Sequence, residues 1–246
     1  SLPNFVCSII LEQPKFSRSP SYVIHAFQVL HVIHPFQIID AIAFDPFVLK
    51  DVTLRNRIAV PPMCQYRADD GLINDWHRIH LAALARGGAG LVLDDAQAQA
   101  LAPVVESIRA AGAVPGIQIA HAGRKASANV PWEGDDHIPD GDPRSWQPVA
   151  PSAVAFGAHL PRVPRALTLD EIARIQRQFV AAAVRARDAG FEWLELHFAH
   201  GYLAQSFVSI HANQRSDQYG GSAANRGRFV LETLAAVREV WPEHLP

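Results

Sequence analysis

The chain has 246 residues, of which 49% are hydrophobic and 19% are charged, with a formal net charge of -2. This length and composition are typical of a globular protein that buries a large core, and they exclude a mainly disordered chain. Because Lys and Arg are scattered, the sequence predicts no nucleic-acid surface and no anionic-membrane surface, and a small neutral or weakly acidic molecule is the expected partner.

Two further features of the sequence predict a cytoplasmic protein. No run reaches the roughly 18 apolar residues that a membrane helix needs. Cys7 and Cys64 lie far apart and form no disulfide framework, which is typical of a reducing compartment.

Residues 1–42 are predicted to be a leader without a recognisable motif. This stretch is apolar but is interrupted by prolines, and it lacks the basic start and the unbroken apolar block of a signal peptide. Residues 22–24 and 29–33 would suit one or two short strands. A solvated or wrongly translated leader is an equal alternative.

Residues 43–246 alternate short β-branched runs with longer amphipathic stretches, the pattern of β-α units around a parallel sheet. Four units are expected, with strands at 58–63, 90–93, 116–120 and 193–196, and helices at 74–86, 95–111, 168–190 and 225–241. A closed (β/α)8 barrel needs eight strands. The predicted fold class is therefore α/β, a TIM (β/α)8-type barrel truncated to about four β-α units, or half a barrel.

Two local patterns refine this expectation. Thr168 and Glu171 have the spacing of a capping box, so a helix is expected to begin there. Residues 123–166 carry seven prolines and four glycines, which indicates a long surface excursion that can cover a site.

Three ring-bearing side chains, His197, His200 and Tyr202, follow the last expected strand at its carboxyl end, where barrel enzymes keep their chemistry. Two neutral imidazoles can each donate an N–H to one substrate oxygen, and a phenol can deliver a proton. This pattern favours a carbonyl-polarising site with an acid attached. The alternatives are a histidine pair that only packs, or a zinc hydrolase site, which would need a third ligand.

Four blocks in order resemble the flavin-dependent Old Yellow Enzyme family of NADH:flavin oxidoreductases, which reduce activated alkenes on a TIM barrel. They are residues 45–66, 116–125, 197–202 and 213–222. The order of the blocks implies that the chain corresponds to the N-terminal half of that barrel. Cys64 before Tyr66, with the insert at residues 131–134, is most similar to the thermophilic-like branch and its xenobiotic reductase A type.

The resemblance implies FMN and NAD(P)H as cofactors. A turn before Tyr66 would lie against the flavin, with its thiol tuning the redox potential, and one glutamine would hydrogen-bond the pyrimidine side of the ring, where an amide can both donate and accept. These cofactor-binding residues would be Pro61, Pro62, Met63, Cys64 and Gln118.

For the substrate, the resemblance implies an enone-type molecule whose C=C bond is reduced. His197 and His200 would bind the carbonyl oxygen, Tyr202 would protonate the α-carbon, and Tyr66 would help to hold the substrate. The protein supplies alignment and polarisation while the cofactor supplies reactivity. No metal is expected.

The sequence also departs from the family pattern. A loop of about twenty residues that covers the flavin has no counterpart between Asp94 and Asp95, so these aspartates are expected to supply both turn and N-cap. The strands, arginine and phosphate loops of the second half-barrel are not matched either. A truncated, non-catalytic relative that cannot hold FMN is therefore an open alternative, and self-association through the open half barrel is expected. The role of His121, Arg124 and Lys125 stays open between anion binding and structure.

Overall fold

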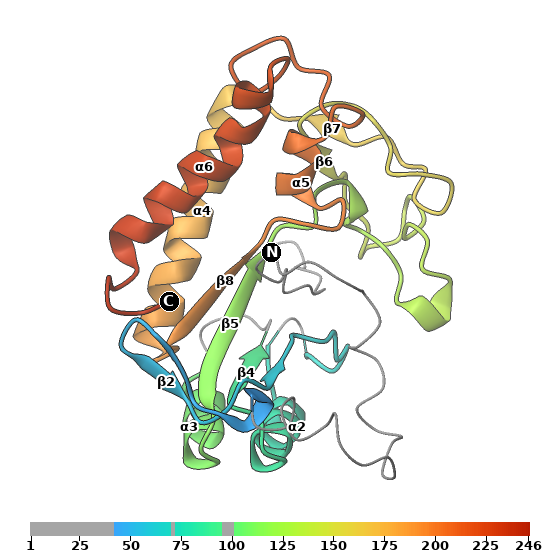
Figure 1. The fold of residues 1–246 in the computed structure, drawn as a ribbon. Helices are drawn as coiled ribbons and strands as arrows, with labels where there is room; N and C mark the ends of the chain where they lie inside the picture. The colour runs from blue at the N-terminus through green and yellow to red at the C-terminus, as the bar shows by residue number, and fades with distance from the viewer. Residues whose placement is uncertain (1–41, 70–71, 95–100) are drawn as a thin grey trace, which may run out of the picture.

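The computed structural model of the protein describes residues 42–69, 72–94 and 101–246 (Figure 1). The strands expected at residues 22–24 and 29–33 lie outside the described residues. So does Asp95, which was expected to supply a turn and a helix cap.

The central feature of the described residues is a sheet of four parallel strands. They are β3 (Ala59–Val60), β4 (Leu91–Asp94), β5 (Val114–Ala120) and β8 (Trp193–His197), and they lie side by side in chain order. The helices α2 (Asp75–Arg86), α3 (Ala102–Ala110), α4 (Leu169–Asp188) and α6 (Ala223–Val240) each follow one strand. The predicted α/β class and the four β-α units are confirmed.

The two faces of the sheet pack against different partners. On one face, Ile119, Leu194 and Leu196 contact α4 and α6, which lie side by side (Figure 1). On the other face, Leu91 and Leu93 pack with a hairpin. That hairpin joins β1 (Phe47–Leu49) to β2 (Val52–Leu54) and lies at the amino ends of the strands (Figure 1). This second face corresponds to the interior of a barrel, and it is apolar near the amino ends of the strands, where the hairpin packs.

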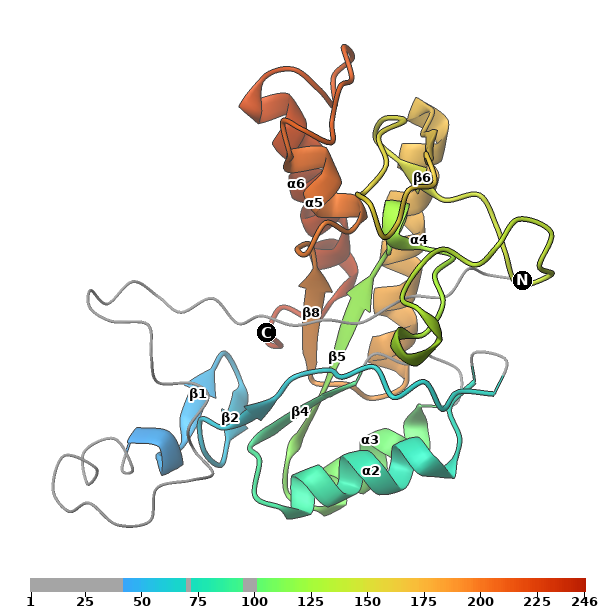
Figure 2. The same ribbon diagram turned by 90° about the vertical axis from the view of Figure 1, so that its right-hand side faces the viewer.

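The chain between β5 and α4 leaves the sheet and lies beyond the carboxyl ends of β5 and β8 (Figure 2). It contains two short 3-10 helices, η2 (Gly123–Lys125) and η3 (Pro131–Glu133), and a two-stranded sheet of β6 (Val149–Ala150) and β7 (Arg165–Ala166). Arg162 holds this excursion together, because its guanidinium donates to Ser127 Oγ and to the carbonyls of Ile138 and Trp146. These hydrogen bonds stabilise the excursion.

Several elements were not predicted from the sequence. The hairpin strands and the strands of the excursion are two or three residues long, too short to show a period. A short helix, α5 (Leu203–Val208), follows the ring cluster. Helix α6 begins earlier than expected because Ser222 Oγ accepts the N–H of Asn225 and caps it. In the described ranges, no helix is both long and apolar enough to cross a membrane.

The predicted capping box at the start of α4 is present. Thr168 Oγ1 accepts the N–H of Glu171 at 3.2 Å, and Glu171 Oε2 accepts the N–H of Thr168 at 2.9 Å. The helix then buries one face against the sheet and α6, as the spacing predicted. The buried side chains are Ile172, Ile175, Phe179, Ala183 and Ala186.

We expect Thr168→Ala to lower the free energy of unfolding by about 1 kcal/mol, because the substitution leaves the N–H of Glu171 without its cap. Urea unfolding followed by circular dichroism measures the change. Thr168→Ser, which keeps the hydroxyl, is the matched control and should lose only a small part of that stability. Equal losses in both variants would contradict the capping role.

Candidate functional site

The site lies where β5 and β8 end together. Their register pairs Gln118 with Glu195 and Ala120 with His197. Since alternate residues of a strand point to opposite faces, Gln118, Glu195 and His197 share one face. Leu194 and Leu196, which alternate with them, pack toward the helices. The polar side chains thus line the upper part of the barrel interior, above the apolar hairpin contact.

The structure brings the three predicted rings together. The centroid of the His197 ring lies 5.0 Å from that of His200 and 4.9 Å from that of Tyr202, with interplanar angles of 75° and 79°. The turn that permits this has positive φ at His200 (54°) and Gly201 (74°). Both φ values are in the left-handed region, which reverses the chain so that His200 and Tyr202 both face His197.

The His197 imidazole is neutral at pH 7. Its side chain is buried, with 3% of the residue exposed, and Nε2 has no hydrogen-bond partner among the described residues. Burial, with smaller contributions from the charges of His200 and Lys125, lowers the pKa of His197 to about 4. A neutral ring with a buried, unpartnered nitrogen is suited to donate an N–H to a substrate oxygen.

Gln118 and Glu195 form a second polar pair, deeper in the interior. Gln118 is 4% exposed, and its Nε2 donates to Glu195 Oε1 at 2.7 Å. Burial raises the pKa of Glu195, and the hydrogen bond from Gln118 partly opposes this shift. A carboxylate can only accept, so the amide nitrogen must face Glu195. The carbonyl oxygen of Gln118 then remains as a buried acceptor without a hydrogen-bond partner in the described residues.

The residues expected to contact the flavin from the first strand lie at the carboxyl end of β3. Pro61 and Pro62 follow that strand directly, Pro62 is buried, Cys64 is half-buried and Met63 is exposed. Strands β4 and β5 separate this turn from β8. The roles of these four residues toward a cofactor stay predictions.

Tyr66 follows the same turn and is 43% exposed. Its ring meets that of Trp132, on η3 of the excursion, in an edge-to-face contact with centroids 5.1 Å apart. The structure therefore places Tyr66 against the excursion, after β3, which is the edge strand opposite β8. Its predicted substrate contact remains a prediction.

Sequence reasoning left two neighbours of the rings without a role. Lys125, on η2, has its Nζ 5.1 Å from the centroid of the Tyr202 ring and donates to the carbonyl of His200 at 3.4 Å. Phe156, in the excursion, lies 4.7 Å from the same Nζ. The available signal for Lys125 was its position just after β5. Nothing local marks Phe156.

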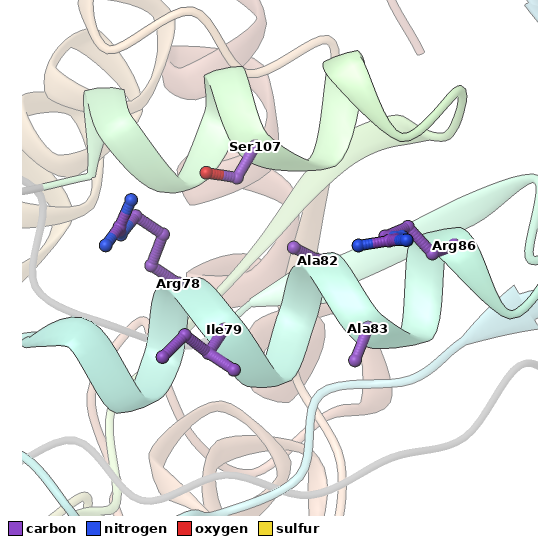
Figure 3. A pocket seen from close by; sticks show the side chains of 6 residues that line it. All are labelled: Arg78, Ile79, Ala82, Ala83, Arg86 and Ser107. Atoms are coloured by element: carbon purple, nitrogen blue, oxygen red, sulfur yellow. The ribbon is translucent and has the colours of Figure 1, made fainter.

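A surface hollow of about 490 Å³ lies elsewhere, between α2 and α3 on the helix side of the sheet (Figure 3). Its lining residues are Arg78, Ile79, Ala82, Ala83, Arg86 and Ser107. It shares no residue with the ring cluster. We therefore place the candidate site at the strand ends and not in this hollow.

The zinc alternative has no support in the part of the chain that the structure describes. Within it, no group of three or more His, Cys, Asp or Glu side chains could hold a metal ion. Among the residues that the structure describes, His197 and His200 lack the third protein ligand that a zinc site needs.

Comparison with known proteins gives consistent similarities. Residues 86–245 match the model of the NADH:flavin oxidoreductase / NADH oxidase family. The chain is 39% identical over 224 residues to an NADPH dehydrogenase of Clostridium acetobutylicum, covering 82% of this chain and 61% of that protein. It is 38% identical over 225 residues to an NADH:flavin oxidoreductase of Gibberella zeae, covering 82% of this chain and 54% of that one.

Solved structures show the same fold. Morphinone reductase in complex with tetrahydroNAD superposes with a TM-score of 0.70 at 33% identity, covering 82% of this chain and 62% of that one. The Old Yellow Enzyme homologue from Zymomonas mobilis gives a TM-score of 0.69 at 28% identity, covering 82% of this chain and 61% of that one. The chain thus spans a little over half of the length of the relatives that it matches.

Folding should weaken in mild acid. Burial lowers the pKa values of both His121 and His197 to about 4, whereas an unfolded histidine titrates near 6.5. Between these values the unfolded chain binds more protons, so the free energy of unfolding decreases as pH falls from about 6.5 to about 4. Urea unfolding at several pH values measures the slope, and His197→Gln should reduce it. A flat profile through this range would contradict the neutral, buried state of these rings.

The Gln118–Glu195 pair predicts a second titration. We expect the Glu195 carboxyl to titrate above its ordinary value of about 4.5. Gln118→Leu, which removes the donor from a buried carboxylate, should raise its pKa further. Carbon-detected NMR of labelled glutamate measures both midpoints. A lower midpoint in the leucine variant would show that Gln118 does not donate to Glu195.

Proposed function

Since the chain belongs to the NADH:flavin oxidoreductase / NADH oxidase family, and its fold is that of the Old Yellow Enzyme barrel, we propose that it is an FMN-dependent NAD(P)H oxidoreductase. Its proposed substrates are α,β-unsaturated carbonyl compounds, whose C=C bond it reduces. Because the chain covers 61% of the NADPH dehydrogenase it matches, the activity of the whole enzyme is part of the proposal.

The observation that supports this proposal is the convergence of His197, His200 and Tyr202 at the end of β8. A phenol and an imidazole each stand against one central, neutral ring. Such a cluster can bind a carbonyl oxygen through N–H donors, and the adjacent phenol can act as a separate acid. The Nε2 of His197 is buried without a hydrogen-bond partner among the described residues, and a substrate oxygen that pairs with it would offset the cost of burying it.

The chain also offers groups that suit a flavin. The buried carbonyl oxygen of Gln118 needs an N–H donor, and the pyrimidine ring of FMN carries one. The turn from Pro61 to Cys64 stands at the carboxyl end of the same sheet and would hold the ring from the other side. When bound, FMN supplies the hydride-transfer chemistry that protein side chains lack.

In the proposed mechanism, the two histidines bind the substrate and Tyr202 supplies a proton. The N–H groups of His197 and His200 donate to the substrate carbonyl oxygen, which withdraws electron density from the conjugated C=C bond. The β-carbon then becomes electron-poor. Tyr202 Oη delivers a proton to the α-carbon, and the neutral state of His197 keeps it in the role of hydrogen-bond donor. The proposed net reaction adds two hydrogens across the double bond.

The reductant, the location and the assembly of the protein are further parts of this proposal. A nicotinamide reductant is supported by relatives that are named NADPH dehydrogenase. A cytoplasmic location rests on the cysteine pattern. Self-association through the half barrel is supported by β3 and β8, which are edge strands of the described sheet.

The first test is whether the purified chain binds FMN. We expect titration with the chain to shift the flavin absorbance bands and quench the flavin fluorescence, and Gln118→Leu to weaken binding about tenfold by leaving the flavin N–H without its acceptor. Fluorescence titration measures the dissociation constants. A chain that is colourless after incubation with excess FMN and removal of the unbound flavin would support the alternative of a non-catalytic relative.

The second test addresses the chemistry. With FMN, NADPH and 2-cyclohexenone present, we expect oxidation of NADPH and formation of cyclohexanone. Tyr202→Phe should slow the alkene step by about 10²-fold or more, since it removes the acid, while NADPH still reduces the flavin. Anaerobic stopped-flow absorbance separates the two half-reactions. Equal alkene rates in the variant and the wild type would remove Tyr202 from the mechanism.

A further inference from the structure

Lys125 stands where the two strand ends meet. It is the last residue of η2, which follows β5, and its ammonium group reaches across to the residues that follow β8. The start of η2 is held close to α5, because Leu203 donates its N–H to the carbonyl of His121 and the Cα of Gly123 lies against the Leu203 backbone. Lys125 is therefore fixed at its base, and its side chain is half-buried.

The ammonium group makes three contacts around the ring cluster. It donates to the carbonyl of His200 at 3.4 Å, and it lies 5.1 Å from the centroid of the Tyr202 ring and 4.7 Å from that of Phe156. A cation over an aromatic face is attracted by the ring, more strongly when solvent is excluded. Two of the three contacts are to residues of the proposed mechanism.

We propose that Lys125 is a positioning residue of this site. It connects the left-handed turn at His200 and Gly201 to the end of β5, and it places a positive charge beside the three rings. A non-glycine residue with φ near +54° is strained and needs support from its surroundings. The hydrogen bond to the His200 carbonyl supplies part of that support. The contact with Tyr202 then fixes the phenol relative to the same turn.

The charge of Lys125 also separates the roles of the rings. It acts together with burial and with His200 to lower the pKa of His197. Burial lowers the pKa of Lys125 itself, Asp135 opposes that shift and Arg124 adds to it. Glu195 is the remaining charged group on the face of β8 that carries His197. A cation beside a neutral, buried imidazole adds to the effect of burial and opposes its protonation, so proton delivery is left to Tyr202.

This inference deepens the proposed function and rests on it, because Lys125 would position the rings that carry out the proposed reaction. Its test does not need FMN or substrate. A failure of flavin binding would therefore leave the result on Lys125 standing, and the two outcomes remain distinguishable.

The test is a titration of the His197 ring by NMR in the apo chain with labelled histidine, assigned by comparison with His197→Gln. In Lys125→Met, which keeps the length but removes the charge, we expect the pKa of His197 to rise. Lys125→Arg should keep it low. Lys50→Met is the matched control, since the exposed Lys50 bonds the carbonyl of Glu243 far from the rings. Its His197 midpoint should equal that of the wild type.

A His197 midpoint that is the same in Lys125→Met and in the wild type, with the fold retained by circular dichroism, would overturn the proposal. If Lys125→Met does not fold, the wild-type chain carries the test. It has three lysines, Lys15, Lys50 and Lys125, so labelled lysine gives few signals. The Lys125 signal should titrate below 10.5, and the ring signals of His197 and Tyr202 should move with the same midpoint. Ring signals that do not follow this titration would equally overturn it.

Discussion

The parallel register of β5 and β8 is the constraint on which the site depends. It sets Gln118 beside Glu195 and Ala120 beside His197. A slip of β8 by one residue would turn Glu195 and His197 toward the helices and bring Leu194 and Leu196 into the interior. The apolar packing of α4 and α6 against one face prevents that slip. Burial of leucine on one side of the sheet therefore decides where a histidine and an amide stand on the other.

Buried polar groups differ in how they are partnered. Arg162 bonds serine hydroxyls and carbonyls, and Arg215 bonds Asp217 and the carbonyls of Pro151 and Leu167. At the strand ends, the Nε2 of His197 and the carbonyl oxygen of Gln118 lack hydrogen-bond partners among the described residues. Each such atom costs about 1–3 kcal/mol, and a bound ligand that pairs with it would return that energy.

The excursion is joined to the site by cations. Arg124 donates to the carbonyls of Val154 and Ala155, and both Arg124 and Lys125 lie over the ring of Phe156. Phe156 in turn packs against Gly201, where a side chain would meet its ring. Lys125 thus contacts both Phe156 of the excursion and the turn at His200. A change in the position of the excursion would therefore change the contacts of the turn that holds the rings.

The sequence alone determined the β-α units, because helical and strand periods, the capping box at Thr168 and the glycine stops are local signals. It also determined the ring cluster, since His197, His200 and Tyr202 lie within six residues of one another. The tertiary structure decided the rest. The hairpin and the strands of the excursion are too short to carry a period and form only against their partners. The contacts of Glu195 with Gln118 and of Lys125 with Tyr202 join residues 77 apart in the chain, and only strand register and turn geometry bring such residues together.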